Sequence, residues 1–318
     1  DEIALDSLEY IEGDLYIEYP NSNVNFINLE NIDGNLQIQG WNYCCNYSEW
    51  YGGAGLYSIN FPSLLNVHNL TLSSLRDVNY INFDNLTTVN ELDILGGGHS
   101  PNMFGSSGFD LSTFNNLQSA YRIKLYRTKF GEISGFQNLE SVNNIEISEN
   151  NQLQELSGFN NVNSINNLSI YDNALQELSG FNNVNSINNL SINNNGSLST
   201  CCRIYDLSQV TPGDNISIYS NGGGCSTLLQ VASNCGITYC GTSGVTTIID
   251  SQSDLDNIAG CTDFYGNLTI KSGSSSINFD EIALDSLEYI EGDLYIEYPN
   301  SNVNFINLEN IDGNLQIQ

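Results

Sequence analysis

Basic residues are scarce in this chain. Its 318 residues include only 7 lysines and arginines against 37 aspartates and glutamates, so the formal net charge is −30 at pH 7. Nucleic acids and anionic membrane surfaces bind basic protein surfaces, and we therefore predict neither as a partner. The surplus of negative charge also favours a hydrated, soluble surface.

Long hydrophobic runs and metal-ligand spacings are absent as well. No stretch of 18 or more apolar residues occurs, so the sequence predicts no membrane insertion. The sequence has no C-x-x-C motif, and its two histidines, His68 and His99, lie far apart. We therefore predict no metal site and no cofactor.

The even number of cysteines favours disulfides over zinc. In an acidic chain that is rich in Asn and Ser, such a set indicates an oxidising location, which is extracellular or at the cell surface. We predict that every cysteine is oxidised, while the pairing stays open. The cysteines are Cys44, Cys45, Cys201, Cys202, Cys225, Cys235, Cys240 and Cys261.

What the sequence does contain is an unmutated duplication. Residues 1–39 recur without a mismatch as residues 280–318, an offset of 279 residues. We interpret this as one period of a tandem array followed by the start of the next period. An artificial overlap is the alternative. A tandem array of near-identical modules is typical of a long polymer or stalk rather than of a catalyst.

A second period of about 22 residues lies inside the long one. ELSGFNNVNSINNLSI occupies 155–170 and again 177–192, and a looser relative, EISGFQNLESVNNIEI, occupies 132–147. The apolar spacings of 3, 3, 3 and 2 fit one coil of a solenoid, in which the final Leu-x-Ile is the strand. The asparagines between sides are expected to hydrogen-bond from coil to coil. The expected strand anchors are Leu15, Leu36, Leu70, Leu92, Ile123, Ile145, Leu168, Leu190, Ile216, about Ile248, and Leu268.

These anchors predict an all-β protein, a right-handed β-helix or solenoid with about eleven coils per module. Two longer spacings predict extruded loops, at 40–55 and 96–108. We assign 1–240 to the body and cysteine-stapled end cap of one module, 241–244 to a joint, and 245–318 to the first coils of the next, identical module. The natural module would then begin near Val245 and continue into the sequence numbered from 1.

Several stretches resemble the receptor L-domain family. They are IAGCTDFYGNLTI (258–270), LDSLEYIEGDLYI (284–296) and NLENIDGNLQI (307–317). The cap, LSTCCRIYDL (198–207) followed by ISIYSNGGGCSTLLQVASNCG (216–236), resembles the ends of such domains in repetitive secreted proteins of Bacteroidetes-type bacteria. The resemblance implies a leucine-rich-repeat-like right-handed β-helix. It also implies either a protein-ligand receptor or a cell-surface component.

No catalytic constellation is evident. A nucleophile needs an adjacent base, and the histidines lie in an Asn-rich coil and a Gly-rich loop. On the outward face of the expected strands, acids occur at the middle of Leu-x-Ile only as Asp93 and Glu146, with Lys124 between them. They should lie roughly 10 Å apart, near the wide limit for inverting glycosidases. We favour a solvated charge pair and predict that the protein is not an enzyme.

Two groups of residues are candidate interfaces. One is the aromatic loop, which either contacts a glycan or protein ligand or folds back over a coil edge; its residues are Trp41, Tyr43, Tyr47, Trp50 and Tyr51. The other holds four of the seven basic residues and is placed to dock on an acidic neighbour, unless its side chains are simply solvated; it consists of Arg122, Lys124, Arg127 and Lys129.

Glycosylation and calcium are further possibilities. Asn-x-Ser/Thr sequons occur about as often as chance predicts from the composition, so their number is no argument for glycosylation; they begin at Asn46, Asn69, Asn85, Asn167, Asn189, Asn195, Asn215 and Asn267. In a Bacteroidetes-type protein, Asp-Ser-Leu at 6–8 resembles an O-glycosylation site at Ser7. Asp250, Asp254 and Asp256 lack the Gly and distal Glu of an EF-hand, and we favour a cap or turn there.

The sequence therefore leads to a structural hypothesis: a non-catalytic module of a long extracellular filament or surface stalk, assembling end to end with identical modules and possibly also laterally. The alternative is a cell-surface adhesin or receptor module whose 40–55 loop binds a glycan or a protein.

Overall fold

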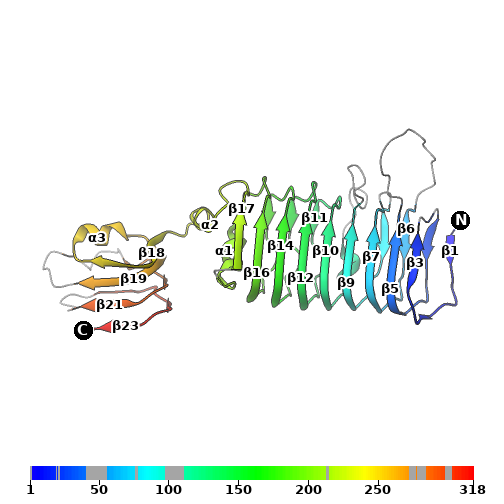
Figure 1. The fold of residues 1–318 in the computed structure, drawn as a ribbon, viewed down its shortest axis with the longest axis horizontal. Helices are drawn as coiled ribbons and strands as arrows, with labels where there is room; N and C mark the ends of the chain where they lie inside the picture. The colour runs from blue at the N-terminus through cyan, green and yellow to red at the C-terminus, as the bar shows by residue number, and fades with distance from the viewer. Residues whose placement is uncertain are drawn as a thin grey trace. The chain divides into compact units, whose positions relative to one another are not determined.

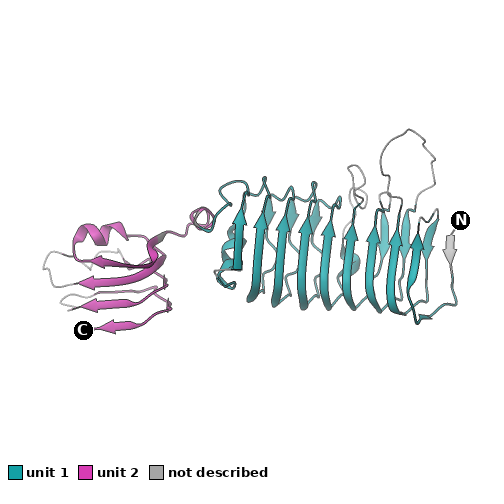
Figure 2. Ribbon diagram, in the orientation of Figure 1, with its two compact units in different colours: residues 1–228 teal, residues 229–318 magenta. Residues whose placement is uncertain are grey.

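The computed structural model describes residues 2–18, 20, 22–40, 56–75, 78–96, 111–212, 215–271, 277, 284–297 and 303–318. The chain forms two compact units, Asp1–Leu228 and Leu229–Gln318 (Figure 2). The predicted loops at 40–55 and 96–108 fall almost entirely outside the described residues.

Unit 1 is a parallel β-solenoid, in which successive coils add neighbouring strands to the same sheet (Figure 1). Its main sheet has ten strands in the order β17-β16-β14-β12-β10-β9-β7-β5-β2, with β3 also paired to β5. These strands are β2 (Tyr10–Ile11), β3 (Leu15–Glu18), β5 (Asn31–Gln39), β7 (Asn66–Ser73), β9 (Thr88–Leu95), β10 (Ser119–Tyr126), β12 (Ser141–Ser148), β14 (Ser164–Tyr171), β16 (Ser186–Asn193) and β17 (Ile216–Tyr219).

Two shorter parallel sheets form other sides of the coils. One has the order β1-β4-β6-β8, and its strands are β1 (Glu2–Ala4), β4 (Asn23–Asn25), β6 (Ser58–Asn60) and β8 (Tyr80–Asn82). The other contains β11 (Glu132–Ile133), β13 (Glu155–Leu156) and β15 (Glu177–Leu178). The prediction of a β-solenoid with coils of about 22 residues is confirmed.

The apolar skeleton seen in the sequence is the core. In one coil Phe136, Leu139, Val142, Ile145 and Ile147 are all at most 4% exposed. Equivalent phenylalanines stack face to face from coil to coil, with ring centroids 4.7 to 5.9 Å apart, because each coil places its ring above the same ring of the previous one; the stack consists of Phe26, Phe61, Phe83, Phe114, Phe136, Phe159 and Phe181.

A buried column of amides runs beside the phenylalanines, as expected for asparagines at equivalent corners. Asn150, Asn173 and Asn195 each accept, on the side-chain oxygen, a hydrogen bond from the backbone N–H of the preceding member, beginning with Thr128. Asn221 accepts the last such bond, from Asn195, at 3.0 Å. The side-chain amides donate in turn to buried carbonyls such as Leu125 O. Polar corners of the coil are therefore satisfied inside the core.

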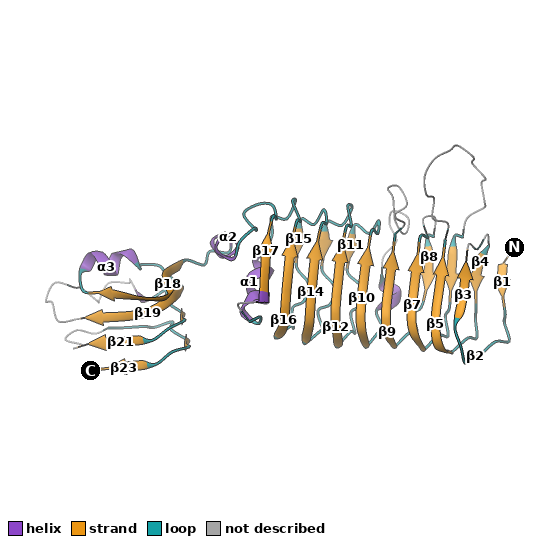
Figure 3. Ribbon diagram, viewed as in Figure 1, coloured by secondary structure: helices purple, strands orange, loops and turns teal. Residues whose placement is uncertain are grey.

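Four short helices occur in the described residues (Figure 3). They are η1 (Ser112–Phe114), α1 (Cys202–Gln209), α2 (Leu228–Asn234) and α3 (Gln252–Asn257). Helix α1 buries Ile204 and Leu207 and contacts β15 and β16. A disulfide between Cys201 and Cys225 holds this end of unit 1, so the predicted cysteine-stapled cap is confirmed. Cys202 and Cys235 are also disulfide-bonded.

Unit 2 contains a six-stranded parallel sheet. Its strands are β18 (Tyr239–Ile249), β19 (Asp263–Lys271), β20 (Tyr289–Ile290), β21 (Leu294–Glu297), β22 (Asn310–Ile311) and β23 (Leu315–Ile317). Residues 241–244, which we assigned to a joint, lie within β18, and the boundary between the compact units falls at 228/229. Cys240, assigned to the end cap, forms a disulfide with Cys261 inside unit 2.

One strand anchor was misplaced. Thr247, not Ile248, pairs with the anchor Leu268, and Ile248 is 46% exposed whereas Ile249 is buried. The cause is a register irregularity between Gly241 and Thr246, where the offset to the paired residue of β19 falls from 24 (265 − 241) to 21 (267 − 246); this odd change reverses the alternation of β18.

Described parts of the two 39-residue copies share strands and hydrogen bonds, since β2 and β3 of the first copy correspond to β20 and β21 of the second. Asn35 N and Asn314 N each donate to the equivalent aspartate, Asp14 or Asp293, at 2.7 Å. The tyrosines Tyr10 and Tyr289 each donate to the aspartate 23 residues later. In the sheet of unit 1, the last strand of this segment, β5, pairs with β7. In the sheet of unit 2, strand β21 of the second copy pairs with β19, which comes before the segment in the chain.

Candidate functional site

The outward face of the ten-stranded sheet presents its side chains in straight rows, because the parallel strands are in register. The residues between the Leu and Ile of each strand pair directly across the sheet, as the sequence predicted. They are Tyr16, Gln37, Thr71, Asp93, Lys124, Glu146, Ser169, Ser191 and Ser217. The charged members lie together on β9, β10 and β12.

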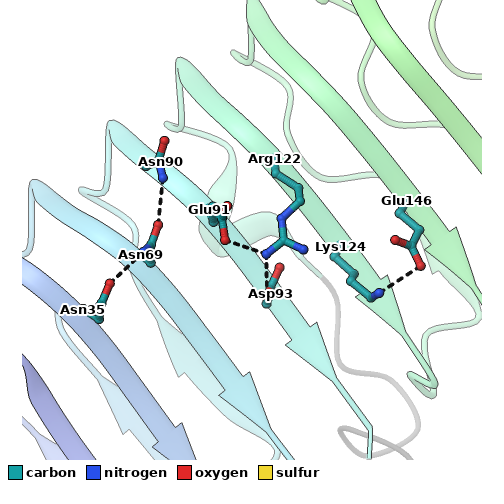
Figure 4. A network of polar contacts seen from close by, with 8 residues as sticks. All are labelled: Asn35, Asn69, Asn90, Glu91, Asp93, Arg122, Lys124 and Glu146. Atoms are coloured by element: carbon teal, nitrogen blue, oxygen red, sulfur yellow. Dashed lines mark hydrogen bonds and ion pairs between the residues drawn. The ribbon is translucent and has the colours of Figure 1, made fainter. Parts of the chain in front are cut away.

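Arg122 on β10 is the centre of this charged group (Figure 4). Its Nη2 contacts Glu91 Oε2 at 2.5 Å and Asp93 Oδ2 at 2.9 Å, both on the neighbouring strand β9. Asp93 is only 16% exposed at the side chain, and burial raises the pKa of its carboxyl, although the Arg122 guanidinium acts in the opposite direction. The sequence analysis did not pair Arg122 with Glu91, although the two side chains form an ion pair in the structure.

Lys124 and Glu146 form the second half of the network. Lys124 Nζ lies 3.0 Å from Glu146 Oε1, and the Tyr171 hydroxyl donates to the same oxygen at 2.9 Å. Burial tends to raise the pKa of Glu146, but the hydrogen bonds from Lys124 and Tyr171 outweigh it, so this pKa lies below its usual value. Each carboxylate is thus held by a cation on the adjacent strand.

This geometry fits a structural charge network better than a pair of catalytic carboxyls. Opposite pKa shifts on two acids can mark an acid and a base. Here, however, Lys124 occupies the row position directly between Asp93 and Glu146, where a reacting bond would have to lie. The prediction that the protein is not an enzyme is left as a prediction.

Asparagines flank the charged group and continue the rows. Asn69 Nδ2 donates to Asn35 Oδ1 at 2.7 Å, and Asn90 Nδ2 donates to Asn69 Oδ1 at 3.0 Å (Figure 4). On the other side, Asn189 donates to Asn167 at 2.7 Å. The charged residues therefore interrupt a ladder that is otherwise made of amides.

The basic group predicted as a docking patch is largely neutralised within its own sheet. Besides the pairs of Arg122 and Lys124, Arg127 Nη2 lies 2.6 Å from Glu149 Oε2. Lys129 is half-buried in the turn that follows β10. Three of the four cations thus already have carboxylate partners, which weakens the expectation that they dock on an acidic neighbour.

The aromatic-loop prediction lies outside the described residues, as do the two cysteines and the sequon within that loop. These are Trp41, Tyr43, Cys44, Cys45, Asn46, Tyr47, Trp50 and Tyr51.

The remaining modification candidates differ in accessibility. Asn195 is fully buried in the amide column and donates to Asn221 Oδ1 at 3.1 Å, so its side chain is not accessible to a transferase in the folded protein. The half-buried sequon residues are Asn69, Asn167 and Asn267, and the exposed candidates are Asn85, Asn189, Asn215 and Ser7.

The aspartates at 250–256 belong to a helix start. Ser251 is the N-cap of α3, where its Oγ accepts from Asp254 N at 3.3 Å. The Ser251 hydroxyl also donates to Asp254 Oδ2 at 2.5 Å, and this hydrogen bond lowers the pKa of the Asp254 carboxyl. Within the described ranges, no group of three or more His, Cys, Asp and Glu is placed to hold a metal ion.

Comparisons with known proteins give no relative. No protein-family model matches the chain, and no curated protein matches it. In the part of the chain that the structure describes, no helix is long and apolar enough to cross a membrane. The disulfides fit a secreted or extracellular protein.

Proposed function

We propose that this chain is a repeating module of a long extracellular filament or cell-surface stalk, in which identical modules follow one another in the same polypeptide. The module resembles receptor L-domains and acts as a structural, non-catalytic unit. One observation carries the proposal: the described parts of the duplicated segment share strands and hydrogen bonds in two settings, and each setting supplies a neighbouring strand that the other lacks.

The exposure of equivalent side chains supports this view. Leu36 and Ile38 in the first copy are fully buried, because β7 and its coil cover them. Their equivalents in the second copy, Leu315 and Ile317, are 56% and 60% exposed. The same apolar residues are thus covered by the coil of β7 in the first copy. In a tandem array, the equivalent coil would cover them in every copy.

At the first strands of the segment the difference in exposure is reversed: the second copy is covered and the first is exposed. Tyr16 is 55% exposed in the first copy, whereas its equivalent Tyr295 is half-buried and pairs with Thr269 on β19. Joining the two settings gives a solenoid that runs from β18 and β19 through the duplicated segment to β17, with α3 near one end and α1 near the other. Residues 229–238 then belong to the connection between modules.

The extracellular location rests on the disulfides and on the charge. Cys201–Cys225 and Cys240–Cys261 hold coils at the two ends of the inferred module. Disulfides persist in oxidising compartments, and a surface with a net charge of −30 favours a hydrated, extended polymer.

Electron microscopy of a protein with at least three periods tests the proposal. Stacked coils rise by roughly 4.8 Å each, so about eleven coils and a short connection give an expected axial repeat of roughly 50–60 Å. Images of flexible beads with no constant spacing would refute the filament. The alternative, an adhesin or receptor module that uses the 40–55 loop, would then become the better hypothesis.

A further inference from the structure

A second row on this side of the sheet alternates between large and small side chains, and its small members Ser148 and Asn193 are buried between the tyrosines, at 0% and 7% exposed. Tyr126, Ser148, Tyr171, Asn193 and Tyr219 pair in register across β10, β12, β14, β16 and β17. An aromatic ring therefore recurs on every second strand, at a spacing of about 10 Å. We call Tyr126, Tyr171 and Tyr219 the tyrosine row.

Two rings of this row, Tyr126 and Tyr171, are held by their neighbours. The Tyr171 hydroxyl donates to Glu146 Oε1 at 2.9 Å, while Lys124 Nζ and Arg127 Cζ lie 5.7 and 5.1 Å from the Tyr126 ring centroid. Tyr126 and Tyr171 are half-buried and Tyr219 is 49% exposed. Positioned rings lose little conformational entropy on binding, so the row is preorganised for a ligand.

The strands that carry the last two tyrosines, and β16 between them, contain no charged residue, although Glu146 on the adjacent strand β12 accepts from Tyr171. β14, β16 and β17 contain no Asp, Glu, Lys or Arg, although the chain as a whole carries −30. Beside the rings the same strands present the hydroxyls of Ser169, Ser191 and Ser217 and the amides of Asn167 and Asn189. This part of the face combines aromatic rings with neutral hydrogen-bonding groups.

We propose that the tyrosine row is a binding site for an extended, neutral, β-linked polysaccharide that runs across the strands. The C–H faces of sugar rings stack on aromatic rings, and sugar hydroxyls hydrogen-bond with amides and hydroxyls. A β-linked chain that turns over at each sugar presents the same face at every second one, so its period is two sugars. The row likewise repeats every two strands, which aligns successive repeats with successive tyrosines.

The charge of the protein selects among possible occupants. A net charge of −30 repels anionic polymers and further copies of this chain, whereas a neutral glycan meets no such repulsion. This site lies on the described sheet and is independent of both the 40–55 loop and the filament proposal.

Binding of the full-length oxidised protein to insoluble cellulose and to chitin, measured by depletion from solution, tests the site. The wild type should bind at least one of these neutral polymers, and rising salt should not weaken binding. Soluble polygalacturonate, an anionic polymer, should not bind in affinity electrophoresis.

Variants assign the binding to the row. Tyr171→Ser combined with Tyr219→Ser should weaken binding about tenfold, or about 1.4 kcal/mol. Tyr219→Ser alone, at an exposed position that leaves the fold intact, should weaken it less. Tyr171→Phe keeps the ring and should keep binding. Tyr80→Ser is the matched control, because Tyr80 is 50% exposed on β8 in a different sheet.

Three results would overturn the site. The first is that neither neutral polymer binds. The second is that Tyr80→Ser weakens binding as much as Tyr219→Ser does. The third is self-association in sedimentation, without glycan, that the row variants abolish, because this would make a second copy the occupant.

Discussion

Each buried asparagine of the amide column forms hydrogen bonds with backbone groups of a neighbouring coil. Asn173 accepts from Asn150 N at 3.0 Å and donates to Ile147 O at 3.0 Å, and it is 5% exposed. Removing this side chain leaves a buried donor and a buried acceptor without partners, which costs more than the hydrogen bonds gained in folding.

We therefore predict that Asn173→Ala destabilises unit 1 by about 3 kcal/mol. The control is Asn188→Ala, because Asn188 is exposed and also donates to an asparagine one coil away, Asn166, at 2.7 Å. The control should change stability by less than about 0.5 kcal/mol. Urea unfolding measures both, and equal effects would show that the buried column has no special role.

The two row carboxylates should respond to pH with opposite sign. The folded-state pKa of Asp93 is raised, so the folded protein holds this proton more tightly and loses stability as pH rises through that pKa. The pKa of Glu146 is lowered, so its contribution is present above the unfolded pKa of about 4.3 and is lost as pH falls through the folded value.

At neutral pH, Asp93→Asn should therefore stabilise and Glu146→Gln should destabilise, each by a few tenths to about 1 kcal/mol because both sites are partly solvated. Both differences should shrink when urea unfolding is repeated below about pH 4. Shifts in the same direction at neutral pH would contradict the assigned environments.

The sequence located the row residues of the candidate site, because period-2 alternation places Asp93, Lys124 and Glu146 on one face. It did not foresee that Arg122 lies opposite Glu91. That pairing depends on the register of β9 against β10 across a segment of irregular length, 97–110. The sequence analysis also missed the tyrosine row. Its members lie two residues after the centre of Leu-x-Ile, and only that central position was compared between coils.

At the scale of the element, one coil lies against the next at glycines that precede the stacked phenylalanines. A Cβ built on Gly158 would lie 2.7 Å from Gly135 O, and one on Gly180 would lie 2.4 Å from Gly158 O. The following residue, Phe159, has a φ of 62°, so the chain turns sharply here and sends the ring inward. A side chain at these glycines would push two backbones apart.

Gly158→Ala should therefore destabilise unit 1 by about 1–3 kcal/mol, as expected for overpacking against backbone atoms. Gly131→Ala is the control, because a Cβ at Gly131 meets nothing within 4 Å. The control should be neutral or stabilising by up to about 1 kcal/mol. A thermal scan compares the two, and an unaffected Gly158→Ala would mean that the coils can separate without cost.

The coil itself was predictable because its apolar spacings leave few other arrangements. Phe136, Leu139 and Val142 are buried as the 3-3-3 spacing required. Helix α1 was not foreseen, since Cys202–Gln209 is short and its helical character depends on covering Ile204 and Leu207 against the last coils. The anchor in β18 was predicted wrongly, because a pattern of period 2 does not reveal the register irregularity between Gly241 and Thr246.

At the scale of the whole molecule, we propose that the two units each hold part of one solenoid module. The duplicated segment is the basis for this proposal. Strand β19 pairs with its first strands in one copy, and β7 pairs with its last strand in the other copy. The compact boundary at 228/229 and the disulfide between Cys240 and Cys261 support the proposal that residues 239–271 begin a module. This assignment moves the predicted start of the module from Val245 to about Tyr239.

A rearranged chain tests that assignment directly: residues 239–318 followed by residues 40–228, in which the duplicated segment occurs once. We predict one cooperative unfolding transition in urea, because every coil between the two end coils then has a neighbour on both sides. Covering Leu315 and Ile317, which are 56% and 60% exposed, should add about 2 kcal/mol or more. The unrearranged 318-residue chain, with two compact units, should unfold in two transitions. Two transitions in the rearranged chain, seen by circular dichroism and tyrosine fluorescence, would show that the units are separate domains and that the module does not continue through the duplicated segment.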